Sequence, residues 1–136
     1  MVLTTETLLY EMVDLSRMAE FPNPPYRCWQ ASSFDRGSIA PDKPGWFANA
    51  DAGNFLSIHE ENGIAEAVLL DASGPGCLVR IWSANPTGEL RLYIDDLSHP
   101  VLEADFAALV AGDGPIPAPF AIECSRGKNL YLPFLF

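Results

Sequence analysis

Short segments with strand character, each closed by turn residues, fill residues 54–95 and constrain the fold more than any other feature of the sequence. Apolar and polar residues alternate over 77–84 and again over 89–95, as they do in strands with one face in a core. Segments 54–60 and 65–71 are also predicted strands, and Gly, Pro and Asn separate the four segments. This succession predicts an all-β sandwich or barrel.

The beginning of the chain follows a different pattern. Apolar side chains recur at helical spacing over residues 5–20, with Thr4 or Thr5 as the expected N-cap, and the prolines that follow cannot continue a helix. We therefore expect an N-terminal helix and a proline-rich connector over residues 1–25, and a β-sandwich domain over residues 26–136.

The last third of the chain adds two weaker signals. Residues 105–110 suit a helical turn or two, and residues 130–136 form a very apolar final strand that Pro133 interrupts. An unpaired terminal strand of this kind is an aggregation hazard. We therefore expect a domain that is cut short, or one that another chain completes.

The composition and net charge limit the kinds of ligand that the chain can bind. The 136 residues suit one domain, 49% of them are hydrophobic, and the net charge is −10. This charge disfavours nucleic acid and anionic membrane surfaces, whereas a neutral ligand such as a sugar remains compatible. The three cysteines are widely spaced without a zinc pattern, and neither a signal peptide nor a membrane-spanning stretch is visible. The expected location is the cytoplasm.

Residues 26–53 combine loop residues with aromatic and polar side chains, a mixture that is rare in plain linkers. Sugars stack their C–H faces on aromatic rings, while carboxylates, amides and arginines bond their hydroxyls. Alternatively, Trp29 and Trp46 are core anchors and the Asp35–Arg36 pair is local. The side chains that we select as substrate-binding candidates are Asp35, Arg36, Trp46, Asn49 and Asp51.

Catalytic residues are harder to select. A glycosidase needs two facing carboxyl groups, about 5 Å apart for retention or about 6.5–9.5 Å apart for inversion. The spacing of the acidic residues selects no such pair, so we assign no catalytic residue. His59 and His99 have no partner at metal-ligand spacing, so no metal site is expected.

Five segments together carry a family resemblance: residues 32–36, 46–53, 70–86, 90–95 and 125–133. In them the chain resembles the opening of proteins first grouped as domain of unknown function 2961, now glycoside hydrolase family 172. The resemblance implies a jelly-roll fold and retaining, exo-acting cleavage of α-D-furanosides of the fructofuranoside or arabinofuranoside type. It also implies two glutamates as the catalytic pair, trimeric or hexameric assembly, and no metal or other cofactor.

The family's catalytic glutamates match no residue of this chain, and the resemblance implies that they lie beyond Phe136. Asp35, Arg36, Asn49 and Asp51 do match family motifs and are expected to shape the sugar site or a subunit contact. Arg80 is expected to be buried and paired across the sheet, in a structural role.

Three interpretations stay open. The first is the N-terminal part of a furanosidase, inactive as this fragment, because a lone half-site cannot fix two carboxyl groups in one geometry. The second is a non-catalytic carbohydrate-binding or assembly module with the same fold. The third is a small hydrolase with its own carboxylate pair.

Overall fold

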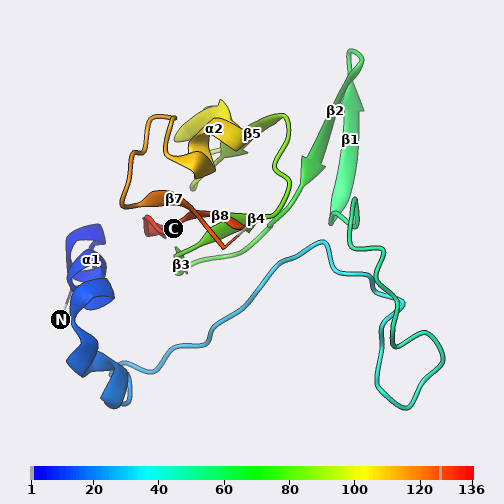
Figure 1. Ribbon diagram of the computed structural model, residues 1–136. Coiled ribbons are helices and arrows are strands. Elements are labelled where there is room, and N and C mark those ends of the chain that lie inside the picture. The colour runs from blue at the N-terminus through cyan, green and yellow to red at the C-terminus, as the bar shows by residue number, and fades with distance from the viewer. Residues whose placement is uncertain (1, 126) are drawn as a thin grey trace. The chain divides into compact units, whose positions relative to one another are not determined.

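The computed structural model describes residues 2–125 and 127–136 and divides them into two compact units. One unit comprises Met1–Phe21 with Ser73–Phe136, and the other comprises Pro22–Ala72. The helices are α1 (Thr5–Val13), the 3₁₀ helix η1 (Leu15–Ala19) and α2 (Phe106–Ala111). The strands, shown in Figure 1, are β1 (Ser57–Glu61), β2 (Ile64–Val68), β3 (Cys77–Leu78), β4 (Ile81–Ser83), β5 (Glu89–Leu92), β6 (Leu102–Asp105), β7 (Ala121–Cys124), β8 (Gly127–Leu130) and β9 (Phe134–Leu135).

The N-terminal helix is confirmed but is shorter than expected. Thr4 caps α1 through a capping box with Thr7, which settles the choice between the two candidate caps. Asp14 then interrupts the helix, because its carboxylate accepts the amide hydrogen of Ser16 at 3.0 Å and starts η1. No residue of α1 or η1 is buried, so its apolar stripe remains at the surface.

Antiparallel pairing organises the strands of the first unit. β8 lies between β4 and β7 in a three-stranded sheet, β5 pairs with β6, and β3 pairs with β9. The apolar terminal strand expected over 130–136 is thus divided between β8 and β9, and both parts have partners. The ring of Phe136 lies against Gly76, where an added Cβ would come within 2.5 Å of it, so only glycine fits there.

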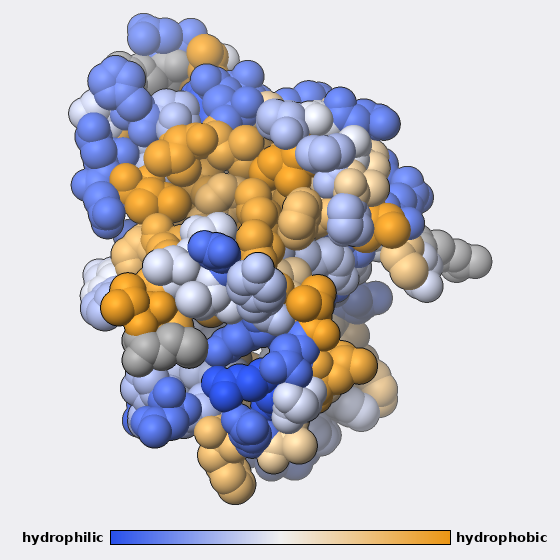
Figure 2. Space-filling model, turned by 90° about the vertical axis from the view of Figure 1, so that its left-hand side faces the viewer, coloured by the Kyte–Doolittle hydropathy of each residue, from blue (hydrophilic) through white to orange (hydrophobic). Residues whose placement is uncertain are grey.

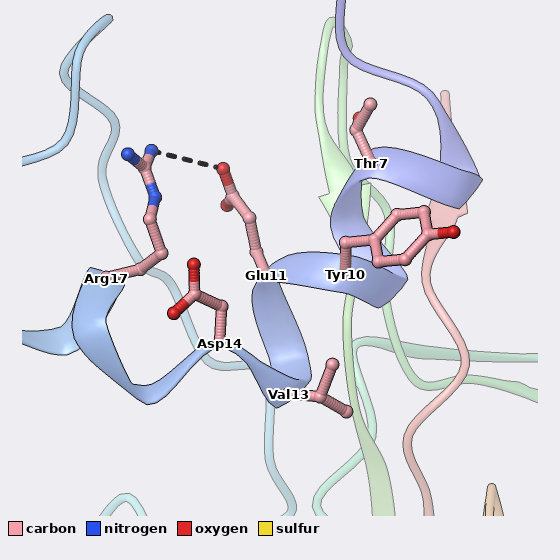
Figure 3. A pocket seen from close by; sticks show the side chains of 6 residues that line it. All are labelled: Thr7, Tyr10, Glu11, Val13, Asp14 and Arg17. Atoms are coloured by element: carbon pink, nitrogen blue, oxygen red, sulfur yellow. Dashed lines mark hydrogen bonds and ion pairs between the residues drawn. The ribbon is translucent and has the colours of Figure 1, made fainter.

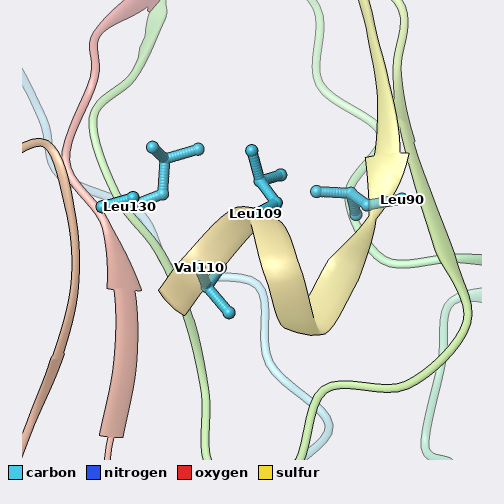
Figure 4. Close-up of a cluster of buried hydrophobic side chains, with 5 residues drawn as sticks. Leu90, Leu109, Val110 and Leu130 are labelled. Atoms are coloured by element: carbon cyan, nitrogen blue, oxygen red, sulfur yellow. The ribbon is translucent and has the colours of Figure 1, made fainter. Parts of the chain in front are cut away.

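The core of this unit lies where α2 meets the sheets (Figure 4). Leu109 of α2 is fully buried and lies between Leu90 on β5 and Leu130 on β8. Asp105 caps α2 by accepting the amide hydrogen of Ala108 at 2.8 Å, and Gly112 ends the helix with a left-handed φ of 89°. The helical turns expected over 105–110 are confirmed, and they supply the centre of the core.

In the second unit, β1 and β2 form a hairpin. Asn62 and Gly63 connect the strands with positive φ values of 52° and 78°, the pattern of a tight turn that matches strand twist. The expected strands over 54–60 and 65–71 are confirmed with shifted ends. Most of this hairpin is exposed.

Two strand predictions need correction. The expected strand over 77–84 is two strands, because β3 pairs with β9 whereas β4 pairs with β8. The sequence reading also missed β6 and β7, which are short and are paired by β5 and β8 respectively.

Many large apolar side chains are exposed in both units, including Phe21, Trp29 and Leu97. Figure 2 shows apolar residues gathered across one face. Surfaces of this kind usually contact something in the working protein. Among the described residues, no helix has the length and apolar character needed to cross a membrane.

Candidate functional site

The carboxylate of Asp35 holds together the loop selected from the sequence. Its Oδ1 accepts the amide hydrogen of Gly37 at 2.9 Å, and its Oδ2 accepts that of Ala50 at 3.0 Å. The amide of Asp35 in turn donates to Asp51 Oδ1 at 2.7 Å. These bonds tie the two ends of a stretch of about fifteen residues, so Asp35 and Asp51 brace the loop.

Arg36 and Asn54 close the same loop from its other side. Arg36 Nη1 donates to the carbonyl oxygen of Asn54 at 2.9 Å, and the guanidinium lies over the Phe34 ring with its Cζ 4.9 Å from the ring centroid. The Asn54 side-chain amide donates to the carbonyl oxygens of Ser33 at 3.1 Å and Ala50 at 2.6 Å. The sequence reading missed Asn54, although an amide between loop glycine and strand suits such a bridging role.

The hydrogen bonds of Asp35 also determine its charge. The amides of Ala50 and then Gly37 lower the pKa of the Asp35 carboxyl below its ordinary 3.8, and desolvation, the smallest of the three causes, opposes them. The group is therefore ionised at neutral pH and has no proton to give as a general acid.

The aromatic side chains of this loop face solvent. Trp46 and Phe47 form a tilted pair with ring centroids 3.8 Å apart, and they are 41% and 77% exposed. Ser38 Oγ donates to the carbonyl oxygen of Trp46 at 2.5 Å and fixes the backbone beneath the pair. Trp29 is 86% exposed, so the alternative in which Trp29 and Trp46 are core anchors is wrong.

The five selected residues thus divide into two groups. The side chains of Asp35, Arg36 and Asp51 are each engaged in a hydrogen bond to a backbone atom of the loop. Trp46 and Asn49 are exposed on the same loop and are available to a ligand. The hydrogen bonds of the first group hold the loop together, and the Trp46–Phe47 pair and the Asn49 amide are exposed to solvent on it.

Two carboxylates also meet on the β5–β6 hairpin. Arg91 Nε donates to Glu103 at 2.8 Å, and the same guanidinium is bonded to Glu89. The bond from Arg91 lowers the pKa of the Glu103 carboxyl. A glycosidase needs a general acid with a raised pKa, so this exposed ion pair lacks the electrostatics of a catalytic dyad.

A shallow hollow lies along the N-terminal helices and is shown in Figure 3, lined by Thr7, Tyr10, Glu11, Val13, Asp14 and Arg17. Arg17 Nη2 is paired with Glu11 at 3.3 Å and Nη1 with Glu20 at 2.7 Å, so its charge is already compensated. The hollow is formed by α1 and η1 alone and contains none of the selected site residues. Nor do the described residues group three His, Cys, Asp or Glu side chains that could hold a metal ion.

Comparison with known proteins identifies a family. A family model described as the GH172 first beta-sandwich domain matches residues 24–136, most of the chain. No curated protein and no solved structure matches.

Proposed function

Because the chain belongs to glycoside hydrolase family 172, as the first β-sandwich domain of that family, we propose that it is part of a retaining exo-hydrolase of α-D-furanosides. Fructofuranosides and arabinofuranosides are the proposed substrates. The domain's proposed task is to bind or frame the sugar, and its sandwich is proposed to have jelly-roll topology. The family match over residues 24–136 is the observation that carries this proposal.

The loop of residues 32–54 supports a sugar-binding role. Ordering a flexible loop around a ligand costs conformational entropy, and the bonds to Asp35, Asp51 and Asn54 remove much of that cost in advance. The exposed Trp46–Phe47 pair offers apolar ring surface to the C–H face of a sugar, and Asn49 offers donors and an acceptor to its hydroxyls.

The catalytic glutamates are proposed to lie outside these 136 residues. The Glu89–Arg91–Glu103 cluster supports this, because its carboxylates are exposed and engaged by a cation. The chain alone is therefore proposed to be inactive. The same observation favours the second candidate function, a non-catalytic carbohydrate-binding or assembly module.

The proposed assembly is a homo-oligomer, a trimer or hexamer, and the proposed location is the cytoplasm. The exposed apolar side chains support contact with other protein surface. All three cysteines are free, and free thiols persist in a reducing compartment.

Titration of the ¹⁵N-labelled chain with methyl α-D-arabinofuranoside tests the loop. We expect the indole resonance of Trp46 and the side-chain amide of Asn49 to shift together and to saturate. The shift at Asn49 should vanish in Trp46→Ala, which removes the stacking surface. It should persist in Trp29→Ala, which removes a second exposed tryptophan of the same unit. If the chemical shifts of Trp46 and Asn49 do not change as sugar is added, the loop does not bind the sugar.

A further inference from the structure

The sheet β4–β8–β7 has a second face, which points away from the core. Ile81 pairs with Leu130 and Trp82 with Asn129, while Ile122 on β7 pairs with Asn129. Side chains alternate along a strand, and Leu130 is buried in the core. Trp82, Asn129 and Ile122 therefore share the opposite face, which we call the outer face.

Trp82 lies on this outer face, and its indole is partly exposed to solvent. A Cβ added at Gly127 would lie 2.3 Å from the indole Nε1 and 3.3 Å from both Cδ1 and Cε2. Equal distances to the two neighbouring ring atoms mean that the Nε1 edge, rather than a ring face, points at the glycine. The side chain is 54% exposed, so ring surface remains available to a ligand.

Arg80 is held beside this tryptophan in a fixed orientation. Its Nε and Nη2 both donate to Asn129 Oδ1, at 3.2 and 2.7 Å, and its Cζ lies 5.6 Å from the centroid of the Tyr131 ring. Asn129 is 4% exposed, and its amide donates to the carbonyl oxygen of Gly127 at 3.2 Å. Arg80 itself is exposed, which corrects the expectation that it is buried, although its pairing across the sheet is confirmed.

A guanidinium has five donors in a rigid fork, and Asn129 uses the Nε edge. Nη1 of Arg80 has no hydrogen-bond partner among the described residues, and Asn129, which holds the guanidinium, is the residue that pairs with Trp82 in the sheet. A preoriented donor beside an exposed aromatic ring suits a ligand that has both apolar C–H faces and hydroxyl groups. The net charge of −10 disfavours an anionic ligand, so the chemistry points to a neutral saccharide.

We propose that Arg80, Trp82 and Tyr131 form a saccharide-binding surface on the outer face of the β4–β8–β7 sheet. The surface belongs to the first compact unit, whereas the loop of residues 32–54 belongs to the second. Neither proposal depends on the other. The outer face would hold a sugar unit without cleaving it, because the residues that form it include no carboxylate.

Titration of the ¹⁵N-labelled chain with short fructo-oligosaccharides tests this surface. The Trp82 indole and Arg80 Nε resonances should shift and saturate together. Trp82→Ala and Arg80→Gln should each weaken binding about tenfold, a ratio that corresponds to the loss of about 1.4 kcal/mol. Trp29→Ala is the matched control and should leave affinity at this face unchanged, and Trp82→Tyr should retain part of it, since a ring remains.

Several results would overturn the proposal. One is the absence of any shift at the two resonances in folded protein with millimolar sugar. Another is a shift that follows protein concentration instead of sugar, which would make the outer face a contact between copies. A third is tighter binding of a sugar acid than of its neutral counterpart, which would make the ligand an anion. Failure here would leave the response of Trp46 and Asn49 to arabinofuranoside unaffected, so the two proposals fail separately.

Discussion

Truncation of Leu109 tests whether α2 is the centre of the core. The side chain is fully buried between Leu90 and Leu130. Leu109→Ala removes three carbon atoms, which costs about 2.4 kcal/mol at about 0.8 kcal/mol for each buried carbon. The cavity that remains raises the expected loss to about 3–5 kcal/mol.

Urea unfolding of the chain, followed by circular dichroism, measures this loss. Such a loss is a large part of the about 5–15 kcal/mol that stabilises a typical domain, so the midpoint should fall steeply at an unchanged slope. Leu97→Ala is the matched control, since Leu97 belongs to the same unit and is 85% exposed. It should change stability by less than about 0.5 kcal/mol. Equal losses in the two variants, or a loss below about 1 kcal/mol at Leu109, would show that Leu109 is not at the centre of the core.

Three further predictions concern other parts of the chain. Gly127→Ala should displace the indole of Trp82 and cost about 1–3 kcal/mol, which tryptophan emission and urea unfolding would detect, and unchanged emission would contradict the contact. The lowered pKa of Asp35 means that its stabilising bonds are fully present above its ordinary value of 3.8 and are lost as pH falls through the lower folded value. Hydrogen exchange of the two bonded amides, corrected for intrinsic rates, should accelerate in that window, and the Asp35→Asn variant should show no such step. Burial raises the pKa of the Cys77 thiol, so alkylation at pH 8 should be slower there than at exposed Cys28, and equal rates would argue against its burial.

The sequence predicted those parts of the fold in which local pattern and tertiary pairing agree. The hairpin around Asn62 and Gly63 is an example, because its turn residues and flanking strands are adjacent in the chain. The break between β3 and β4 was beyond such reasoning, since it arises from pairing with two strands about fifty residues away. β7 was missed because Ala121–Cys124 has little strand character until β8 pairs with it.

The candidate site was predicted as a set of residues but without their roles. Composition and motif resemblance selected Asp35 and Asp51, yet residue type alone cannot tell a carboxylate that meets a sugar from one that meets backbone amides. The structure shows the latter for both. The exposure of Trp46 was equally beyond the sequence, because tryptophan fills cores as readily as it binds ligands.

The release of sugar from 4-nitrophenyl α-D-arabinofuranoside, with the anomer of the first product read by ¹H NMR, measures whether the domain can catalyse hydrolysis without the family's glutamates. We expect no turnover by the 136 residues alone. We expect hydrolysis with retention by a protein in which this domain is joined to the family's catalytic glutamates. Turnover by the 136-residue chain would contradict the first expectation, because a working carboxylate pair would then lie among the residues described above.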